Sequence, residues 1–270
     1  MSRLKISAIS YLNTAPLLWD FEHGEAGKAF DISYTIPSAC AEALRAGTAD
    51  IGIIPSAAYT TIPDLAIVPD VAIASNGAVR SILLVSECPI EEVHTVALDS
   101  SSMTSIALSK ILFAKWLSGE RKYVSLKPDL QTMLSTCDAA LLIGDPALQV
   151  NRNRYVTLDL AEEWKKRTGK PFVFAFWAVR KQALQQREPH AIAEVFRESR
   201  NHGLGAKNLE RIVEQWAPRL RLPQEDIRRY LTQNIHYYLD SLCLEGLESF
   251  YRYAAELGIL PPAPNLEYLA

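Results

Sequence analysis

The stretch Ser10-Tyr11-Leu12-Asn13-Thr14-Ala15-Pro16 decides the fold, because it ends a short apolar run at residues 4–9. A second polar turn, Ile36-Pro37-Ser38, opens a helical pattern that ends at Gly47. The segment Asp50-Ile51-Gly52-Ile53-Ile54-Pro55-Ser56 then reads as a buried strand with a polar end. This order of strand, helix, strand, helix, strand is typical of an open α/β sheet, in which ligands bind beyond the carboxyl ends of the strands.

Length and composition agree with a globular protein. The chain has 270 residues, of which 49% are hydrophobic and 22% are charged, so it has room for a large core and two lobes. Its formal net charge is -3 and its basic clusters are interleaved with acidic or apolar residues, so we expect no nucleic-acid partner. No apolar run approaches the ~20 residues of a membrane span, and no signal peptide precedes the first strand. We therefore expect a cytoplasmic protein with no membrane partner.

The residues that usually mark metal or cofactor sites are scattered. The four cysteines never lie two or three positions apart, which favours a reducing compartment and buried structural roles for Cys40 and Cys137. The five histidines show no metal-ligand spacing, and no nucleophile elbow, dinucleotide fingerprint or P-loop occurs. We expect no metal and no cofactor, so that any chemistry would depend on positioning and electrostatics.

Hydrophobic periodicity divides the chain into two α/β units. The first has strands at 5–9, 32–35, 51–54 and 66–73, which we expect to form a parallel sheet, and helices at 15–21 and 39–46, the second capped by Ser38. The second has strands at 82–85, 95–98, 124–126 and 139–143 and a helix at 103–117. A strand at 172–179 returns the chain to the first unit, and the rest is helical from residue 187.

This order predicts two lobes joined by two crossovers, with a helical C-terminal region. The first lobe comprises residues 1–81 and 175–270, and the second, inserted lobe comprises residues 82–174. Hinged proteins of this architecture bind their ligand in the cleft between the lobes.

Two polar turns are the strongest candidates for ligand binding. Asn13, accompanied by Ser10 and Tyr11, offers two donors and an acceptor at a helix entrance, although an ordinary turn or cap residue is the alternative. The stretch Ser101-Ser102-Met103-Thr104-Ser105 has four hydroxyls in five residues at a helix start, which is more than one N-cap needs. Free N–H groups and the helix dipole favour an anion there.

Other candidates lie where neighbouring strands end. Pro55 and Ser56, together with Ser38 at the next helix start, would face the cleft if the strand order is conventional. Arg80 and Ser81 lie at the first crossover, where a guanidinium could pair with a carboxylate, with a surface arginine as the alternative. Gly144 and Asp145 follow a buried strand, and Asp145 could instead cap the next helix.

Five blocks of sequence, in order, resemble the chorismate dehydratase family of the futalosine route to menaquinone. They are Ser10-Tyr11-Leu12-Asn13-Thr14-Ala15-Pro16-Leu17, the segment from Pro37 to Pro55, Leu98-Asp99 with Ser102-Met103-Thr104-Ser105, Leu142-Ile143-Gly144-Asp145-Pro146-Ala147-Leu148, and the segment from Thr168 to Trp177. Together they span nearly the whole chain. Lys170 departs from the apolar residue expected at its position, which touches only a loop.

The resemblance implies a cofactor-free lyase with a type 2 periplasmic-binding-protein-like fold, which removes water from chorismate to give an enolpyruvyl-oxy benzoate. It points to Asn13 as the catalytic side chain. Because no obvious basic residue lies nearby in the sequence, the substrate's own enolpyruvyl carboxylate is a candidate for the base. Four aromatic residues would exclude water, with plain core packing as the alternative for each: Tyr11, Phe174, Phe176 and Trp177. A solute-binding protein for a small anion remains the competing function, because fold does not fix function. The oligomeric state stays open.

Overall fold

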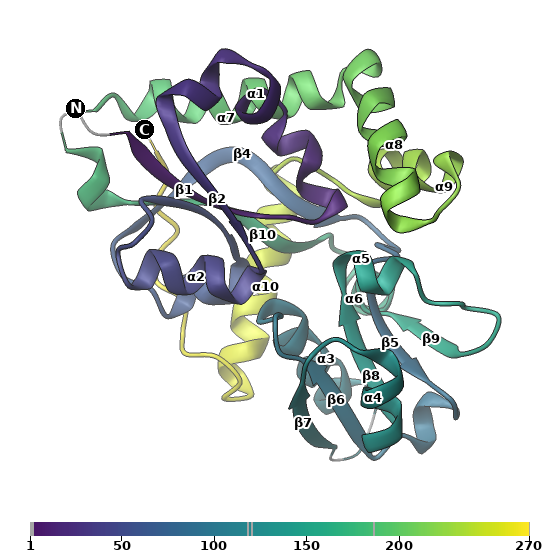
Figure 1. Cartoon of the computed structure of the whole chain (residues 1–270). Helices are drawn as coiled ribbons and strands as arrows, with labels where there is room; N and C mark the ends of the chain where they lie inside the picture. Colours follow the sequence, from purple (N-terminus) through teal and green to yellow (C-terminus); the bar gives the residue numbers. More distant parts are fainter. Residues whose placement is uncertain (1–2, 118, 120, 186, 270) are drawn as a thin grey trace.

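The computed structural model describes residues 3–117, 119, 121–185 and 187–269 and has two lobes, each built on a mixed sheet (Figure 1). The strands of the first sheet, in the order β2-β1-β3-β10-β4, are Phe30–Thr35, Leu4–Ile9, Ile51–Pro55, Phe172–Arg180 and Leu65–Ser75. Those of the second, in the order β7-β6-β8-β5-β9, are Lys122–Leu126, Thr95–Asp99, Ala139–Ile143, Ile82–Ser86 and Val156–Asp159. The predicted two-lobed α/β fold is confirmed.

The first sheet is mixed: the four strands that we expected to be parallel, β1 to β4, do run in one direction, and β10 runs against them. β1 runs parallel to β2 and β3, but β10 runs antiparallel to both β3 and β4. The reason lies in the path of the chain. β10 enters from the second lobe at Phe172, opposite Ser75, which is the end where β4 leaves the sheet. It must therefore run in the reverse direction.

The chain crosses between the sheets twice, at residues 76–81 and 169–171. The expected lobe boundary at residue 174 falls inside β10, which joins the first sheet from Phe172 onward. The second lobe also contains β9, a short edge strand that was not predicted from the sequence. Its burial pattern is mostly exposed or intermediate, so it lacks a strong apolar signal.

Two helix starts differ from expectation for reasons that involve proline. The helix expected at 15–21 begins as the 3-10 helix η1 (Leu12–Leu18), which contains Pro16, and continues as α1 (Trp19–His23). α2 (Pro37–Arg45) begins one residue before Ser38, with Ile36 at the N-cap and no side-chain cap. Proline has no N–H to leave unsatisfied and so takes the first helical position, which makes Ser38 a helix residue rather than the cap.

Other helices cover the sheets. They are η2 (Glu25–Ala29), η3 (Ser56–Thr60), η4 (Ile90–Glu92), α3 (Thr104–Lys115), α4 (Leu130–Thr136), α5 (Gly144–Leu148), α6 (Leu160–Thr168) and η5 (Lys181–Leu184). The C-terminal region, helical as expected, holds α7 (Pro189–Leu204), α8 (Ala206–Leu220), α9 (Gln224–Arg229), the π-helical turn η6 (Tyr230–Asn234) and α10 (Ser241–Glu256). α10 packs on β10 and α7 on β4. Within the described residues, no helix is both long and apolar enough to cross a bilayer.

The outer edge of β4 is covered by two segments from the C-terminal region. Ala74 exchanges backbone hydrogen bonds with His236, both 2.8 Å long. Farther along the strand, the Ile67 N–H donates to Glu267 O at 2.7 Å, and Leu269 N–H donates to Ile67 O at 2.9 Å. The chain thus pairs much of this edge with its own tail.

Candidate active site

A cavity of about 60 Å³ lies between the two lobes, where strands from both sheets end; we call it the inner cavity. Small-molecule sites usually have volumes of about 300 Å³ or more, so the lobes are closed too tightly here for a metabolite. Its lining comprises Ile9, Tyr11, Asn13, Thr14, Pro37, Pro55, Ile73, Ile82, Ser102, Met103, Thr104, Ser105, Ile143, Gly144, Phe174 and Ala175.

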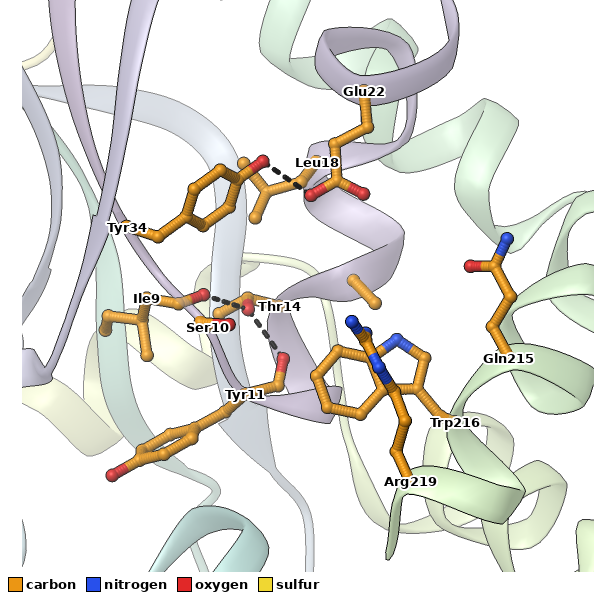
Figure 2. Close-up of a pocket in the computed structure, with 11 residues that line it drawn as sticks. Ile9, Ser10, Tyr11, Thr14, Leu18, Glu22, Tyr34, Gln215, Trp216 and Arg219 are labelled. Atoms are coloured by element: carbon orange, nitrogen blue, oxygen red, sulfur yellow. Dashed lines mark hydrogen bonds between the residues drawn. The ribbon is translucent and has the colours of Figure 1, made fainter.

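The turn after β1 brings Asn13 to this cavity. The Thr14 hydroxyl lies within hydrogen-bond distance of two backbone carbonyls, Ile9 O at 2.6 Å and Tyr11 O at 2.7 Å (Figure 2). Thr14 is itself buried, so these contacts fix the turn from within. A rigid turn holds the Asn13 side chain with far less entropy to lose on binding than a mobile loop would.

The second lobe contributes the N-terminus of α3. Ser102, Met103, Thr104 and Ser105 line the inner cavity at this helix end. Met103 is the N-cap, no side chain caps the helix, and its first turn holds no acidic residue. The first N–H groups of a helix have no intrahelical acceptors, so this end can donate hydrogen bonds to a carboxylate.

Hydrogen bonds join the lobes on either side of the cavity. The Thr104 hydroxyl oxygen accepts from Ala57 N–H at 3.1 Å and donates to Phe174 O at 3.1 Å. The Ser38 N–H donates to Ser101 O at 3.0 Å. These bonds tie the start of α3 and the loop before it to the first lobe.

Tyr11 crosses from the first lobe to the second. Its ring lies against Gly144, where an added Cβ would be 2.6 Å from Tyr11 Cδ2, and Gly144 has a left-handed φ of +60°. Its hydroxyl interacts with Ser101, whose hydroxyl donates to Asp99 Oδ1 at 2.6 Å. Burial raises the pKa of both Tyr11 and Asp99. Asp99 lies behind the lining and supports Ser101.

Asp145 also joins the lobes. Its Oδ1 accepts a hydrogen bond from the Leu12 N–H at 3.0 Å. Burial raises the pKa of Asp145 to about 6, although the Leu12 hydrogen bond and the positive charge of Arg219 act in the opposite direction. A carboxyl group with this pKa changes charge within the pH range in which enzymes are assayed.

The hydroxyl of Tyr230 reaches the back of the site from the C-terminal region. It donates to Ser81 Oγ at 2.8 Å, and both residues are buried. The side chain of Asn13 lies close enough to this phenol to act against the rise in its pKa. Burial raises the pKa of Tyr230, so the phenol is neutral at physiological pH.

The structure brings nine of the seventeen residues proposed from the sequence to the inner cavity and places the other eight elsewhere. The lining residues among them are Tyr11, Asn13, Pro55, Ser102, Met103, Thr104, Ser105, Gly144 and Phe174. Ser38, Ser81, Ser101 and Asp145 lie one layer behind and make the hydrogen bonds given above.

The remaining four lie in other surroundings. Ser56 is fully buried and donates to Val173 O at 2.8 Å. Arg80 lines a separate surface pocket with Asn151 and Arg152 and has a left-handed φ of 65°. Trp177 packs in the core of the first lobe, with its ring 4.8 Å from that of Phe196. Ser10 lines the outer pocket described next.

A larger hollow of about 660 Å³, the outer pocket, lies on the other side of the 10–14 turn (Figure 2). It shares Ile9, Tyr11 and Thr14 with the inner cavity and is otherwise lined by Ser10, Ala15, Leu18, Glu22, Tyr34, Gln215, Trp216 and Arg219. The guanidinium of Arg219 lies 4.9 Å from the centre of the Trp216 ring. The Tyr11 side chain points away from both of them.

Several lining residues have no polar signal in the sequence. Ile9, Ile73, Ile82 and Ile143 line the cavity because each lies at or beside the end of a strand that faces the cleft. The rule that ligands bind where strands end also predicts that these apolar residues face the cavity. Tyr230 has no such signal, because only the tertiary structure brings it to Asn13.

One cluster of metal-type donors lies apart from the inner cavity, at the start of α10. Donor atoms of His236, Asp240 and Cys243 are within 4.8 Å of one another, although the sequence spacing had suggested no such group. Hydrogen bonds account for the cluster. Asp240 caps α10 by accepting from Cys243 N–H at 2.8 Å, and its other oxygen bonds His236 at 2.8 Å.

The fold is shared with binding proteins. The protein AF1704 from Archaeoglobus fulgidus superposes with a TM-score of 0.78 at 16% identity, over 96% of this chain and 98% of that one. The periplasmic aliphatic sulphonate binding protein SsuA from Escherichia coli gives a TM-score of 0.66 at 17% identity, over 97% and 95%. At such identities the likeness shows the type 2 periplasmic-binding-protein-like fold alone.

Sequence relatives are more specific. A chorismate dehydratase from Thermus thermophilus is 31% identical, over 94% of this chain and 94% of its own. A chorismate dehydratase from Campylobacter jejuni is 27% identical, over 70% of this chain and 69% of its own. The family model described as menaquinone biosynthesis matches residues 4–256. This chain therefore belongs to the menaquinone biosynthesis family.

Proposed function

We propose that this protein is a hydro-lyase that removes water from chorismate to give 3-[(1-carboxyvinyl)oxy]benzoate, in the futalosine route to menaquinone. The observation that carries the proposal is the 31% identity with a chorismate dehydratase over 94% of both chains. The inner cavity suits this substrate, because its polar lining consists of hydroxyl, amide and backbone N–H groups. Such groups can bind a dianion without a buried counter-charge.

The chemistry asks little of the protein. The proton to be lost is on the ring carbon that bears the enolpyruvyl ether. This C–H bond is allylic, so the negative charge left on the carbon is conjugated through the ring alkene with the ring carboxylate. When that C–H bond breaks, its electron pair forms a ring double bond as the C–O bond of the neighbouring hydroxyl breaks. The hydroxyl and the proton leave as water, and the ring becomes aromatic. The protein must fix the substrate and stabilise charge that spreads into the ring carboxylate.

We assign carboxylate binding to the start of α3. Negative charge that develops on the ring carboxylate is stabilised by N–H donors and by the positive end of the helix dipole. Ser102 and Ser105 add hydroxyl donors beside those N–H groups. Because Thr104 binds the first lobe, this helix end is held in position only when the lobes close.

We assign the leaving hydroxyl to Asn13, whose amide can donate a hydrogen bond to the departing oxygen. Among the described residues that line the inner cavity, none is an Asp, Glu, His, Lys or Arg. The substrate's own enolpyruvyl carboxylate, attached through the ether to the carbon that loses its proton, is therefore our candidate for the base. Asp99 and Asp145 lie behind the lining and are hydrogen-bonded to Ser101 and Leu12.

Access to the site follows from its size. The inner cavity is too small for chorismate, so we propose that the lobes open about the two crossovers and close on the substrate. The first lobe, which ends at residue 75 and resumes at residue 172, would move against residues 82–168. A cytoplasmic location is supported by the cysteines, because all four are free thiols, as a reducing compartment requires.

The test is to mix the purified protein with chorismate and follow the loss of diene absorbance, with mass spectrometry of the product. A product lighter than chorismate by one water, formed at a rate proportional to enzyme concentration, supports the proposal. The binding-protein fold favours one other function, capture of a small anion without reaction. Saturable binding of chorismate with no turnover would support that function and contradict ours.

A further inference from the structure

Three helices of the first lobe begin beside the inner cavity without a cap of their own. They are η1, α2 and η3, and none has a side-chain cap or an acidic residue in its first turn. Each instead donates an N–H from its first turn to an acceptor in the second lobe, so closure of the lobes completes all three helix starts. The pairs are Leu12 N–H with Asp145 Oδ1 at 3.0 Å, Ser38 N–H with Ser101 O at 3.0 Å, and Ala57 N–H with Thr104 Oγ1 at 3.1 Å.

Other helices of the protein are capped by the residue that precedes them. Asp129, Asp159 and Asp240 cap α4, α6 and α10 in this way, and none of these three aspartates lines the inner cavity. Such a cap is present whenever its helix is formed. A cap from the opposite lobe is different, because its acceptor is in place only when the lobes are closed.

Among the three acceptors, Asp145 acts on the turn that carries Asn13. Leu12 is the first residue of η1 and directly precedes Asn13. Asp145 lies at the start of α5, which Figure 1 shows at the edge of the second lobe that faces the first. It does not cap its own helix, since α5 has Ile143 at the N-cap and no side-chain cap. The carboxyl group is thus directed at the other lobe.

This hydrogen bond holds the Asn13 turn from outside. The Thr14 hydroxyl makes its two bonds within the turn, so it cannot fix the position of the turn against the second lobe. η1 is a short 3-10 helix, a form with poorer hydrogen-bond geometry than an α-helix. An acceptor for its first N–H restrains the backbone one residue before Asn13. Asp145 does not line the inner cavity, so it acts on this turn and not on the substrate.

We propose that Asp145 is a positioning residue, which caps η1 from the opposite lobe and thereby holds Asn13 in its reactive position when the lobes close. The catalytic part of this inference rests on the proposed function. The cap itself can be tested without any reaction.

The kinetic experiment compares D145A, D145N and D129A in the full chain. Alanine removes the acceptor for the Leu12 N–H, and asparagine keeps an oxygen for it. Asp129 is a matched control, because it also caps a helix of the second lobe, by accepting Thr132 N–H at 2.8 Å. We expect D145A to lower kcat for chorismate by about 10- to 100-fold with KM changed less than about threefold, since misplacement of a reacting group affects the chemical step. D145N should stay within about threefold of the parent, and D129A within about twofold.

Amide hydrogen exchange of the ligand-free protein separates positioning from a general loosening of the lobes. The Leu12 amide should exchange at least about tenfold faster in D145A and within about threefold of the parent in D145N and D129A. The Ser38 amide is the internal reference, because it bonds the second lobe without Asp145. Equal acceleration of the Leu12 and Ser38 amides in D145A would mean that Asp145 only holds the lobes together, and would overturn the inference. Parental kcat in D145A, or equal losses in D145A and D145N, would do the same.

The remaining outcomes also decide it. Should the parent protein not turn over chorismate, the proposed function fails, and the exchange of the Leu12 amide alone decides whether Asp145 caps η1. Should D145A not fold, a pH titration of the parent replaces it: the Leu12 amide shift must change with a midpoint near pH 6, and D145N must abolish this change. The other groups that interact electrostatically with Asp145 are one arginine and two tyrosines, which do not titrate near pH 6: Arg219, Tyr11 and Tyr230. A Leu12 amide that does not titrate, or that titrates equally in D145N, would contradict the cap.

Discussion

The backbone N–H of Leu12 and the carboxylate of Asp145 form a 3.0 Å hydrogen bond that joins the two lobes beside the inner cavity. The same carboxyl group has a pKa raised by burial to about 6. The carboxyl group that links the lobes therefore changes its charge near pH 6, so the pH dependence of the protein's stability can be predicted.

Asp145→Asn should stabilise the protein at pH 8 and have little effect at pH 4. In the unfolded chain this carboxyl ionises at its lower, ordinary pKa, so folding is favoured when it is protonated and is opposed as the pH rises to about 6. Asparagine keeps an oxygen for the Leu12 N–H and removes the titration. We expect the melting temperature of the variant to exceed that of the parent by about 2 °C or more above pH 6.

Arg219→Gln is the companion variant, because the positive charge of Arg219 lowers the pKa of Asp145. Its loss should move the midpoint of the parent's pH dependence upward. A melting-temperature difference between Asp145→Asn and the parent that does not vary with pH would contradict the titration.

Asn13→Ala should lower kcat by about 10²- to 10³-fold, which is the usual effect of removing a donor aimed at developing charge. Asn13→Asp should be no better, because it adds negative charge to a cavity that we expect to hold a dianion. Chorismate turnover measured by diene absorbance checks both variants. Near-parental turnover in either one would remove Asn13 from its assigned role.

Gly144→Ala should prevent closure of the lobes. The new Cβ would lie 2.6 Å from Cδ2 of the Tyr11 ring, and the backbone there has a φ of +60°. Gly169→Ala is the control, since Gly169 has a φ of +70° and an added Cβ would meet no described atom within 4 Å.

Both variants carry the left-handed penalty of about 1–2 kcal/mol, and only the first adds a collision between lobes. We expect Gly144→Ala to lose at least about tenfold in kcat/KM, equivalent to about 1.4 kcal/mol, and to show a larger radius of gyration by small-angle scattering. Similar kinetics and radii for the two variants would mean that the Tyr11–Gly144 contact does not limit closure.

Thr104→Val should destabilise the closed protein by about 1–3 kcal/mol, because a buried N–H of Ala57 loses its acceptor and Phe174 O loses a donor. Ser109→Ala, on the same helix, removes only a local bond to Ile106 O and should cost less than about 1 kcal/mol. Urea unfolding measures both. Equal losses would show that the bonds of Thr104 to the first lobe add no particular stability.

Much of the fold can be predicted from the sequence because buried strands are short apolar runs with polar ends. The strands beginning at Leu4, Ile51, Ile82 and Ala139 lie within a residue or so of their expected places. The direction of β10 could not be read in this way. Strand direction depends on where the chain re-enters the sheet. The apolar pattern of β10 predicts a buried strand but carries no information about its direction.

The site could also be predicted in part from the sequence. Asn13 and the hydroxyls at the start of α3 follow the rule that polar residues at strand ends and helix starts face the cleft. Trp177 was misplaced because aromatic residues on a buried strand alternate between two faces, and its face turns toward Phe196 in the core. Tyr230 could not be found, since more than two hundred residues separate it from Asn13 and only packing unites them.

The pairing of the chain's tail with β4 has a practical consequence for anyone who handles this protein. An edge strand of eleven residues, most of them buried and apolar, would otherwise present unpaired amides to a neighbouring molecule. The segment around Tyr268 pairs with this edge and so opposes edge-to-edge association between molecules. We expect a truncation before this segment to expose the edge of β4 and to promote association between molecules.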